Sequence, residues 1–189
     1  SLSNPEGFGE ANFLAADNTG NLLRVDSTTY ALTPEFHTSQ STFMNGLASN
    51  TDLGIVYWGS GQTVYYYDSL TGTEGVFANL TGQLNGNIES AGAGYLNGFY
   101  YFGVEDGNGT AGLYRIQIGP TGIAPTGGPQ QLAADQPETG LDTLYPNNQP
   151  DYGDLVVTAN GLGQPVIFGS TLNRATGESD VWSFNATTS

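Results

Sequence analysis

The stretch TVYYYDSLTG, from Thr63 to Gly72, decides the fold of this chain. It begins with β-branched and aromatic residues, which are typical of strands, and ends in an Asp-Ser and a Thr-Gly pair, which are typical of turns. In a strand, alternation places Tyr65 and Tyr67 on one face and Tyr66 on the other. Since both faces carry large aromatic side chains, we expect a strand that is covered on both sides.

The same layout occurs three more times, as an apolar alternation followed by Asp, Gln or Asn and then a Ser/Thr/Gly turn. The copies are GNLLRVDSTT (20–29), AGLYRIQIGPTG (111–122) and SDVWSFNATTS (179–189). Their shared polar position falls at Asp26, Asp68, Gln117 and Asn185, so successive copies are 42, 49 and 68 residues apart. The first two spacings match the ~40–50 residues of a four-stranded propeller blade. The third predicts an inserted loop near 135–153, which is rich in Pro, Asn and Asp.

Further candidate strands accompany each copy. One precedes every motif, another precedes that strand in three cases, and a weaker one follows the first three motifs (YALTPEF, GVFANL and PQQLAAD). Turn dipeptides such as Asn97-Gly98 separate these runs, and no window carries the apolar spacing of a helix. The chain 1–189 is therefore predicted to be one all-β domain, propeller-like, with about four blades of antiparallel strands. The approximate blades are 1–40, 41–84, 85–134 and 135–189.

The two ends of this pattern are incomplete, because the first blade lacks its opening strand and the fourth lacks its closing strand. Open sheet edges favour aggregation unless they are paired. Three explanations remain open at this point. Residues 1–10 could close a four-bladed ring, the chain could be a segment of a longer propeller, or neighbouring chains could cover the edges.

NLLRVDSTT and GLYRIQIGPTG resemble the LYRID-like strand and T-G turn of propeller-like repeat proteins on bacterial and other extracellular surfaces. The resemblance covers nearly the whole chain and implies an architecture only, so no catalytic residue is carried over from it. The fourth motif, DVWSFNATTS, departs from the pattern because it lacks the Arg and the Asp.

Charge and composition exclude several classes of function. The chain has three Arg, no Lys and a formal net charge of −15, so phosphate backbones would repel it and no nucleic-acid partner is expected. No apolar run approaches the ~20 residues of a membrane-spanning helix, and no membrane insertion is expected. The absence of Cys rules out disulfides and thiolate metal sites. This acidity suits an extracellular or surface-exposed location.

One loop carries candidate metal ligands. VEDGNGTAG places Glu105, Asp106 and Asn108 around two glycines, in a pattern similar to part of a calcium loop. Calcium takes six to eight oxygen ligands, and this loop offers three side chains. A tight hairpin turn explains the same residues, so calcium is a possible ligand and no other cofactor is expected.

Catalytic signals are scarce. His37 is the single histidine, and no nucleophile-elbow pattern accompanies it, so no catalytic residue is assigned. A glycosidase would need two carboxylates facing each other across a central pocket. Glu10, Glu89 and Asp154 are candidates by position, and nothing in the sequence distinguishes them from solvated acids.

The function expected from these observations is that of a non-catalytic structural or adhesive surface protein, on a cell, a filament or a virion, with protein neighbours in an assembly as partners. The alternative is a carbohydrate-binding module whose partners are glycans. Its candidate stacking residues are Trp58, Tyr145, Tyr152 and Trp182. A glycoside hydrolase is the third possibility.

Arginines occupy equivalent positions in two copies of the third strand, Arg24 and Arg115. In a chain with three basic residues, a structural ion pair is the expected role. An Asp of a neighbouring blade is a candidate partner.

Overall fold

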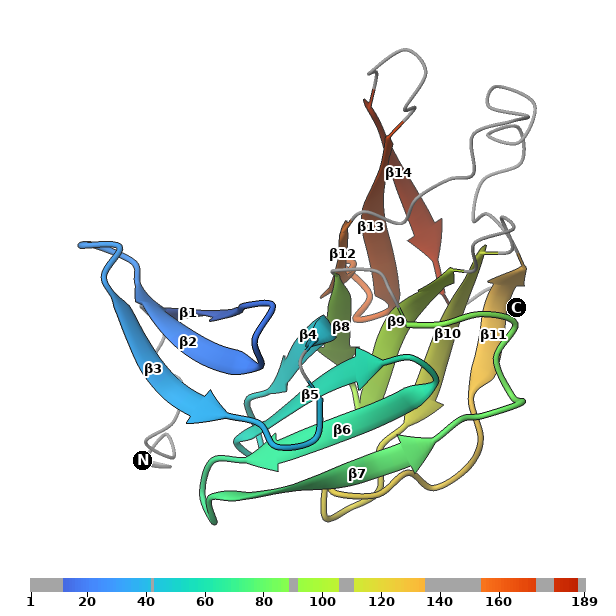
Figure 1. The fold of residues 1–189 in the computed structure, drawn as a ribbon. Coiled ribbons are helices and arrows are strands. Elements are labelled where there is room, and N and C mark those ends of the chain that lie inside the picture. The colour runs from blue at the N-terminus through green and yellow to red at the C-terminus, as the bar shows by residue number, and fades with distance from the viewer. Residues whose placement is uncertain are drawn as a thin grey trace.

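The computed structural model describes residues 12–41, 43–88, 92–105, 111–134, 154–172 and 179–186. Within these residues all regular structure is β, and the strands form four antiparallel sheets (Figure 1). This confirms the predicted all-β, propeller-like fold. Over the same residues, no helix has the length and apolar character needed to cross a lipid bilayer.

Each sheet corresponds to one blade, and the blades are numbered 1 to 4 along the chain. Blade 1 contains β1 (Asn12–Ala16), β2 (Asn21–Asp26) and β3 (Leu32–His37). Blade 2 contains β4 (Asn45–Asn50), β5 (Ile55–Ser60), β6 (Thr63–Asp68) and β7 (Thr73–Asn79). Blade 3 contains β8 (Ala93–Leu96), β9 (Phe99–Glu105), β10 (Ala111–Gln117) and β11 (Gln130–Ala134). Blade 4 contains β12 (Asp154–Ala159), β13 (Pro165–Leu172) and β14 (Ser179–Asn185).

The strand register shows that the four blades are copies of one unit. The shared polar residue of each motif pairs with the first or second residue of the preceding strand, in the pairs Asp26–Asn12, Asp68–Ile55, Gln117–Phe99 and Asn185–Val166. The ladder to the following strand shifts register at one equivalent point, at Leu22/Leu23, Val64/Tyr65 and Leu113/Tyr114. By this register β1 corresponds to β5, β9 and β13, the second strands of their blades. TVYYYD is β6, a third strand.

The innermost strands β4, β8 and β12 lie beside one another where the blades converge (Figure 1). Blade 1 contributes no such innermost strand from the described residues, and blade 4 contributes no outermost one. The second strand of blade 1, β1, therefore stands next to the axis.

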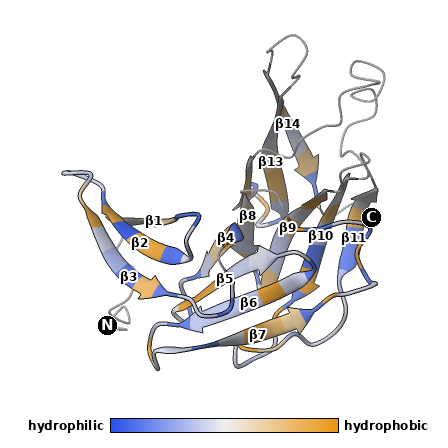
Figure 2. Ribbon diagram, in the orientation of Figure 1, coloured by the Kyte–Doolittle hydropathy of each residue, from blue (hydrophilic) through white to orange (hydrophobic). Residues whose placement is uncertain are grey.

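The core consists of layers between blades rather than one central mass. The first, between blades 1 and 2, contains Leu22, Met44, Val56 and Trp58. The second, between blades 2 and 3, is built around Tyr57, Tyr100 and Phe102, and the third, between blades 3 and 4, contains Tyr101, Leu113, Ile167 and Trp182. Tyr65 and Tyr67 pack in the first layer and Tyr66 against the second, which confirms the predicted alternation. Figure 2 shows the resulting apolar segments along the strands.

The Asp of the motif closes the turn after the third strand. Asp68 Oδ1 accepts hydrogen bonds from the backbone amides of Leu70 (2.9 Å) and Thr71 (3.3 Å). Asp26 Oδ1 accepts from the amides of Thr29 (2.7 Å) and Thr28 (2.9 Å). These backbone donors lower the pKa of Asp26, since they stabilise the charged carboxylate.

The partners that the structure describes for Arg24 and Arg115 lie within their own blades rather than on a neighbouring blade. Arg24 forms its ion pair with Glu35 of β3, inside its own blade. Arg115 Nε donates to Gln130 Oε1 (2.9 Å), and its guanidinium lies 4.8 Å from the centre of the Phe99 ring, again inside one blade. Adjacent strands of a sheet are ~4.8 Å apart whereas stacked sheets are ~10 Å apart, so a partner on the next strand is closer.

Candidate functional site

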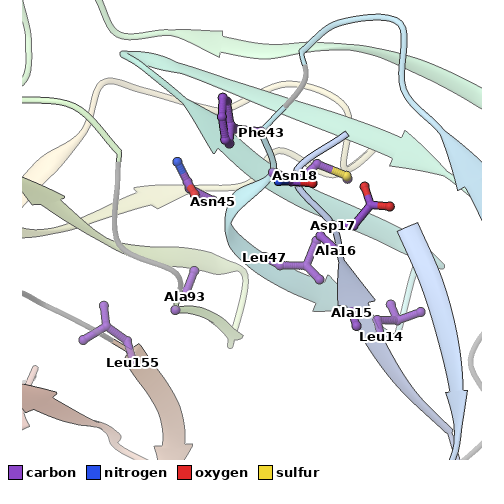
Figure 3. Close-up of a pocket in the computed structure, with 12 residues that line it drawn as sticks. Leu14, Ala15, Ala16, Asp17, Asn18, Phe43, Asn45, Leu47, Ala93 and Leu155 are labelled. Carbon is purple, nitrogen blue, oxygen red and sulfur yellow. The ribbon is translucent and has the colours of Figure 1, made fainter. Parts of the chain in front are cut away.

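A cavity of about 430 Å³ lies at the axis, where β1 meets the innermost strands of the other blades (Figure 3). Its position follows from the incomplete blade 1. Among the described strands β1 pairs with β2 alone, so its other edge borders the cavity. The lining residues are Leu14, Ala15, Ala16, Asp17, Asn18, Phe43, Met44, Asn45, Leu47, Gly92, Ala93 and Leu155.

Most of the lining residues are apolar in type, although polar atoms provide the larger part of the cavity's accessible surface. Leu14, Leu47 and Leu155 come from three different blades and surround the hollow (Figure 3). Phe43, in the segment before β4, stands at the rim and is 56 % exposed. An exposed aromatic ring beside a concave surface that offers both apolar and polar atoms is a typical platform for a ligand.

Two hydrogen bonds hold the Phe43 segment in place. The Trp58 indole Nε1 donates to Ser41 Oγ (3.3 Å), and the Ser41 hydroxyl donates to the Phe43 carbonyl (2.8 Å). Trp58 itself is fully buried between blades 1 and 2. The rim of the cavity is therefore anchored to a rigid part of the core.

Polar groups border the cavity on the same side as Phe43. Asn45 Nδ2 donates to the Ile88 carbonyl (3.2 Å), which orients its amide, and Asn18 is exposed in the β1–β2 turn. Both amides can donate to and accept from a ligand hydroxyl group.

Asp17 is held as a charged acceptor. Its carboxylate accepts from the Asn21 side chain (2.7 Å) and from the backbone amides of Asn21 and Thr19 (2.9 Å each). These donors, the Asn21 side chain foremost, lower the pKa of Asp17 well below its ordinary value of 3.8. Asp17 therefore carries no proton to donate near neutral pH, and it fits an acceptor role rather than that of a general acid.

The described lining contains one carboxylate, Asp17. Glycoside hydrolysis ordinarily uses two carboxyl groups, one of them protonated, and the described lining supplies one carboxylate, which is ionised. Across the described ranges, no three His or carboxylate side chains gather in a group that could hold a metal ion.

The predicted stacking residues Trp58 and Trp182 do not face this cavity. Trp58 is 0 % exposed and stacks on Tyr65 with ring centres 5.8 Å apart, and Trp182 is 2 % exposed in the layer between blades 3 and 4. Both side chains stand on blade faces that the neighbouring blade covers. A sugar cannot reach them, which corrects the expectation drawn from their residue type.

The other predicted residues lie beyond what the structure describes. Tyr145, Tyr152, Asp106 and Asn108 fall outside the described residues, and Glu105 ends β9 with a side chain outside the description. The predicted calcium loop and the two loop tyrosines stay predictions.

The cavity residues Phe43, Asn18 and Asn45 were not singled out from the sequence. A signal exists for Phe43, because it is an aromatic residue just before an innermost strand and outside the strand alternation. No comparable signal marks the amides, since Asn is frequent throughout the turns of this chain.

Comparison with known proteins bears on the architecture. No protein-family model matches the chain, and no match is found among curated proteins. An endo-arabinase from Bacteroides thetaiotaomicron has a similar structure at TM-score 0.53 and 10 % identity, over 92 % of this chain and 73 % of that one. A calcium-binding regucalcin from Agrobacterium tumefaciens matches at TM-score 0.49 and 12 % identity, over 95 % of this chain and 58 % of that one. A puromycin hydrolase matches at TM-score 0.42 and 15 % identity, over 87 % of this chain and 24 % of that one.

The chain thus spans 58 % of the regucalcin and 24 % of the puromycin hydrolase. The similarity to the endo-arabinase supports a propeller-like architecture, but it does not support the surface-repeat type in particular. It also contradicts the expected function. The architecture is shared with an endo-arabinase, so the inference from the repeat to a non-catalytic structural or adhesive protein is wrong.

Proposed function

We propose that this protein binds a short saccharide in the cavity at the propeller axis. The observation that carries the proposal is the exposed ring of Phe43, held at the mouth of a cavity with amide side chains beside it. A sugar ring has an apolar face that stacks on an aromatic ring and hydroxyl groups around its edge that need hydrogen-bond partners.

The polar groups complement such a ligand. Asn45 and Asn18 offer both donors and acceptors, and Asp17 adds a fixed negative acceptor for a sugar hydroxyl. The net charge of −15 disfavours anionic ligands, which leaves neutral saccharides as the best match. A volume of about 430 Å³ lies within the range of small-molecule pockets.

Glycoside hydrolysis is the second candidate, and the shared architecture with an endo-arabinase favours it. Asp17 is a charged acceptor in this site, so a hydrolytic version would need a protonated carboxyl group from another part of the chain. Release of reducing ends during incubation with an oligosaccharide separates this candidate from simple binding.

The proposal includes a location outside the cell, where glycans are the partners. Its supports are the acidity of the chain, the absence of Cys and the resemblance of NLLRVDSTT to surface-protein repeats. Calcium in the loop of Glu105, Asp106 and Asn108 belongs to the same proposal.

Calorimetric titration with arabino-oligosaccharides and other short neutral oligosaccharides tests the proposal. We expect saturable binding to the unmodified chain and a loss of about tenfold or more in affinity for Phe43→Ala, because the stacking platform is removed. Tyr30→Asn is the matched control. Tyr30 is 76 % exposed in the β2–β3 turn, and Asn tolerates its positive φ of 58°.

The control variant should bind like the unmodified chain. Absence of binding by the unmodified chain to every oligosaccharide, or equal affinities for Phe43→Ala and the unmodified chain, would overturn the assignment of the cavity.

A further inference from the structure

Blade 4 exposes three large apolar side chains on the face that points away from blade 3. Val156, Phe168 and Val181 are 57 %, 40 % and 80 % exposed, and they border a shallow hollow of about 210 Å³. Val156 and Phe168 are paired across β12 and β13, while Val181 follows on β14. We call this set of three residues the blade 4 face. Contiguous exposed apolar surface of this kind marks an interaction site in a soluble protein.

The strand register shows what normally covers such a face. Val181 corresponds to Leu22, Val64 and Leu113 in blades 1, 2 and 3, and each of these is completely buried against the following blade. Phe168 corresponds in the same way to Leu14, Tyr57 and Tyr101, which also pack in those layers. The blade 4 face therefore has the composition of a blade–blade interface.

The complementary half of such an interface lies on blade 1. In blade 2, Tyr65 and Tyr67 pack back onto blade 1. Their counterparts in blade 1 are Leu23 and Val25, and Val25 pairs with Leu32, which is 60 % exposed. No blade precedes them among the described strands. Leu23, Val25 and Leu32 are called the blade 1 face.

We propose that the blade 4 face of one molecule packs on the blade 1 face of a second copy of this chain. The contact is head-to-tail, because the two faces are different surfaces of the same molecule. The chain carries both halves of the interface that it repeats internally, and the residues of both sets are uncharged, so burying them leaves no charge unpaired. A second copy is thus a partner of matching chemistry, because it presents the same two classes of blade face.

Light scattering coupled to size exclusion, over a wide range of protein concentration, tests this proposal. At an ionic strength near physiological, where repulsion between chains of charge −15 is screened, we expect species heavier than the 19.8 kDa monomer. Val181→Asp and, as a second variant, Val156→Asp should weaken association by about tenfold or more, because a charge would be buried. Leu162→Asp is the control, since Leu162 is 82 % exposed in the turn between β12 and β13, outside either face.

A mixing experiment tests the pairing of the two faces. Val181→Asp keeps an intact blade 1 face and Leu32→Asp keeps an intact blade 4 face, so each variant alone should remain monomeric. Mixed together, they should form a one-to-one dimer that grows no further. Circular dichroism of both variants establishes that they are folded before mixing.

The proposal is overturned if the unmodified chain stays at 19.8 kDa at every concentration, which would assign the blade 4 face to a different polypeptide segment. It is equally overturned if the two variants do not form a dimer on mixing, or if Leu162→Asp weakens association as much as Val181→Asp does. Saccharide binding is measured separately, so failure here leaves the axial cavity unaffected.

Discussion

Val64 and Val181 occupy the same position in blades 2 and 4, yet Val64 is completely buried whereas Val181 is 80 % exposed. Both are valines in a third strand, so local sequence does not account for the difference. Blade 3 covers Val64, and no described blade follows Val181. Burial in this fold is therefore a property of blade stacking, and the same residue type changes from core to surface at the end of the series.

This relationship predicts unequal costs for equivalent truncations. Leu113→Ala should lower the free energy of unfolding by roughly 2–5 kcal/mol, because Leu113 is buried between blades 3 and 4 and its loss leaves a cavity. Val181→Ala should change it by less than about 0.5 kcal/mol in the monomer. Urea unfolding at low protein concentration measures both values. Comparable losses for the two variants would contradict the proposed stacking of the blades.

Gly169→Ala tests the packing of Trp182. A Cβ at Gly169 would collide with the indole of Trp182, and the two residues are direct partners across β13 and β14. We expect a destabilisation of about 1–3 kcal/mol through overpacking, together with a red shift of the tryptophan emission. Gly161→Ala is the control, because a Cβ there meets nothing within 4 Å. Unchanged melting and emission in Gly169→Ala would show that the indole lies elsewhere.

Acid should destabilise the fold in part through Asp17 and Asp26. Hydrogen bonds lower the pKa of both carboxyl groups below the ordinary 3.8, so the unfolded chain binds more protons than the folded one as the pH falls. Their contribution is complete above the unfolded pKa and is lost as the pH falls below about 3.8 toward the folded values. Urea unfolding at a series of pH values measures the free energy of unfolding as a function of pH. In Asp17→Asn this free energy should fall less steeply as the pH is lowered. An identical pH dependence for the variant would exclude this role of Asp17.

Arg115→Ala should lower thermal stability modestly. The guanidinium contacts the Phe99 ring and Gln130, and loss of both contacts should cost about 1 kcal/mol, or roughly 2–4 °C in Tm. The Tm of Arg115→Lys should lie between that of Arg115→Ala and that of the unmodified chain, because Lys keeps the charge but loses the planar contact with the Phe99 ring. An unchanged Tm in Arg115→Ala would leave Arg115 without a structural role.

Much of the fold could be predicted because residues that are close in sequence define the repeat. Tyr65, Tyr66 and Tyr67 show the period of a strand, and the following Asp marks the turn that its carboxylate closes. The spacing between Asp26 and Asp68 then indicates the size of a blade. These signals depend on neighbours along the chain, which a single sequence displays.

The candidate site could not be predicted in the same way. Trp58 has the composition of a sugar-stacking residue, and only the packing of blade 1 against blade 2 shows that it is buried. Phe43 and Leu155 are far apart in sequence and line one cavity because β1, a second strand, stands where an innermost strand would otherwise lie. The cavity thus depends on how the incomplete blades pack together. The alternation of apolar residues and the turn residues do not predict that packing.

Met44 offers the most direct measurement, because it is the single methionine of the chain and it lines the cavity. Labelling its methyl group with carbon-13 gives one nuclear magnetic resonance signal for that methyl during titration with arabino-oligosaccharides and other neutral oligosaccharides. Binding at the axis predicts a saturable shift of this signal in the unmodified chain and a much weaker response in Phe43→Ala. A signal that stays unchanged at the highest oligosaccharide concentrations would contradict the cavity as the binding site.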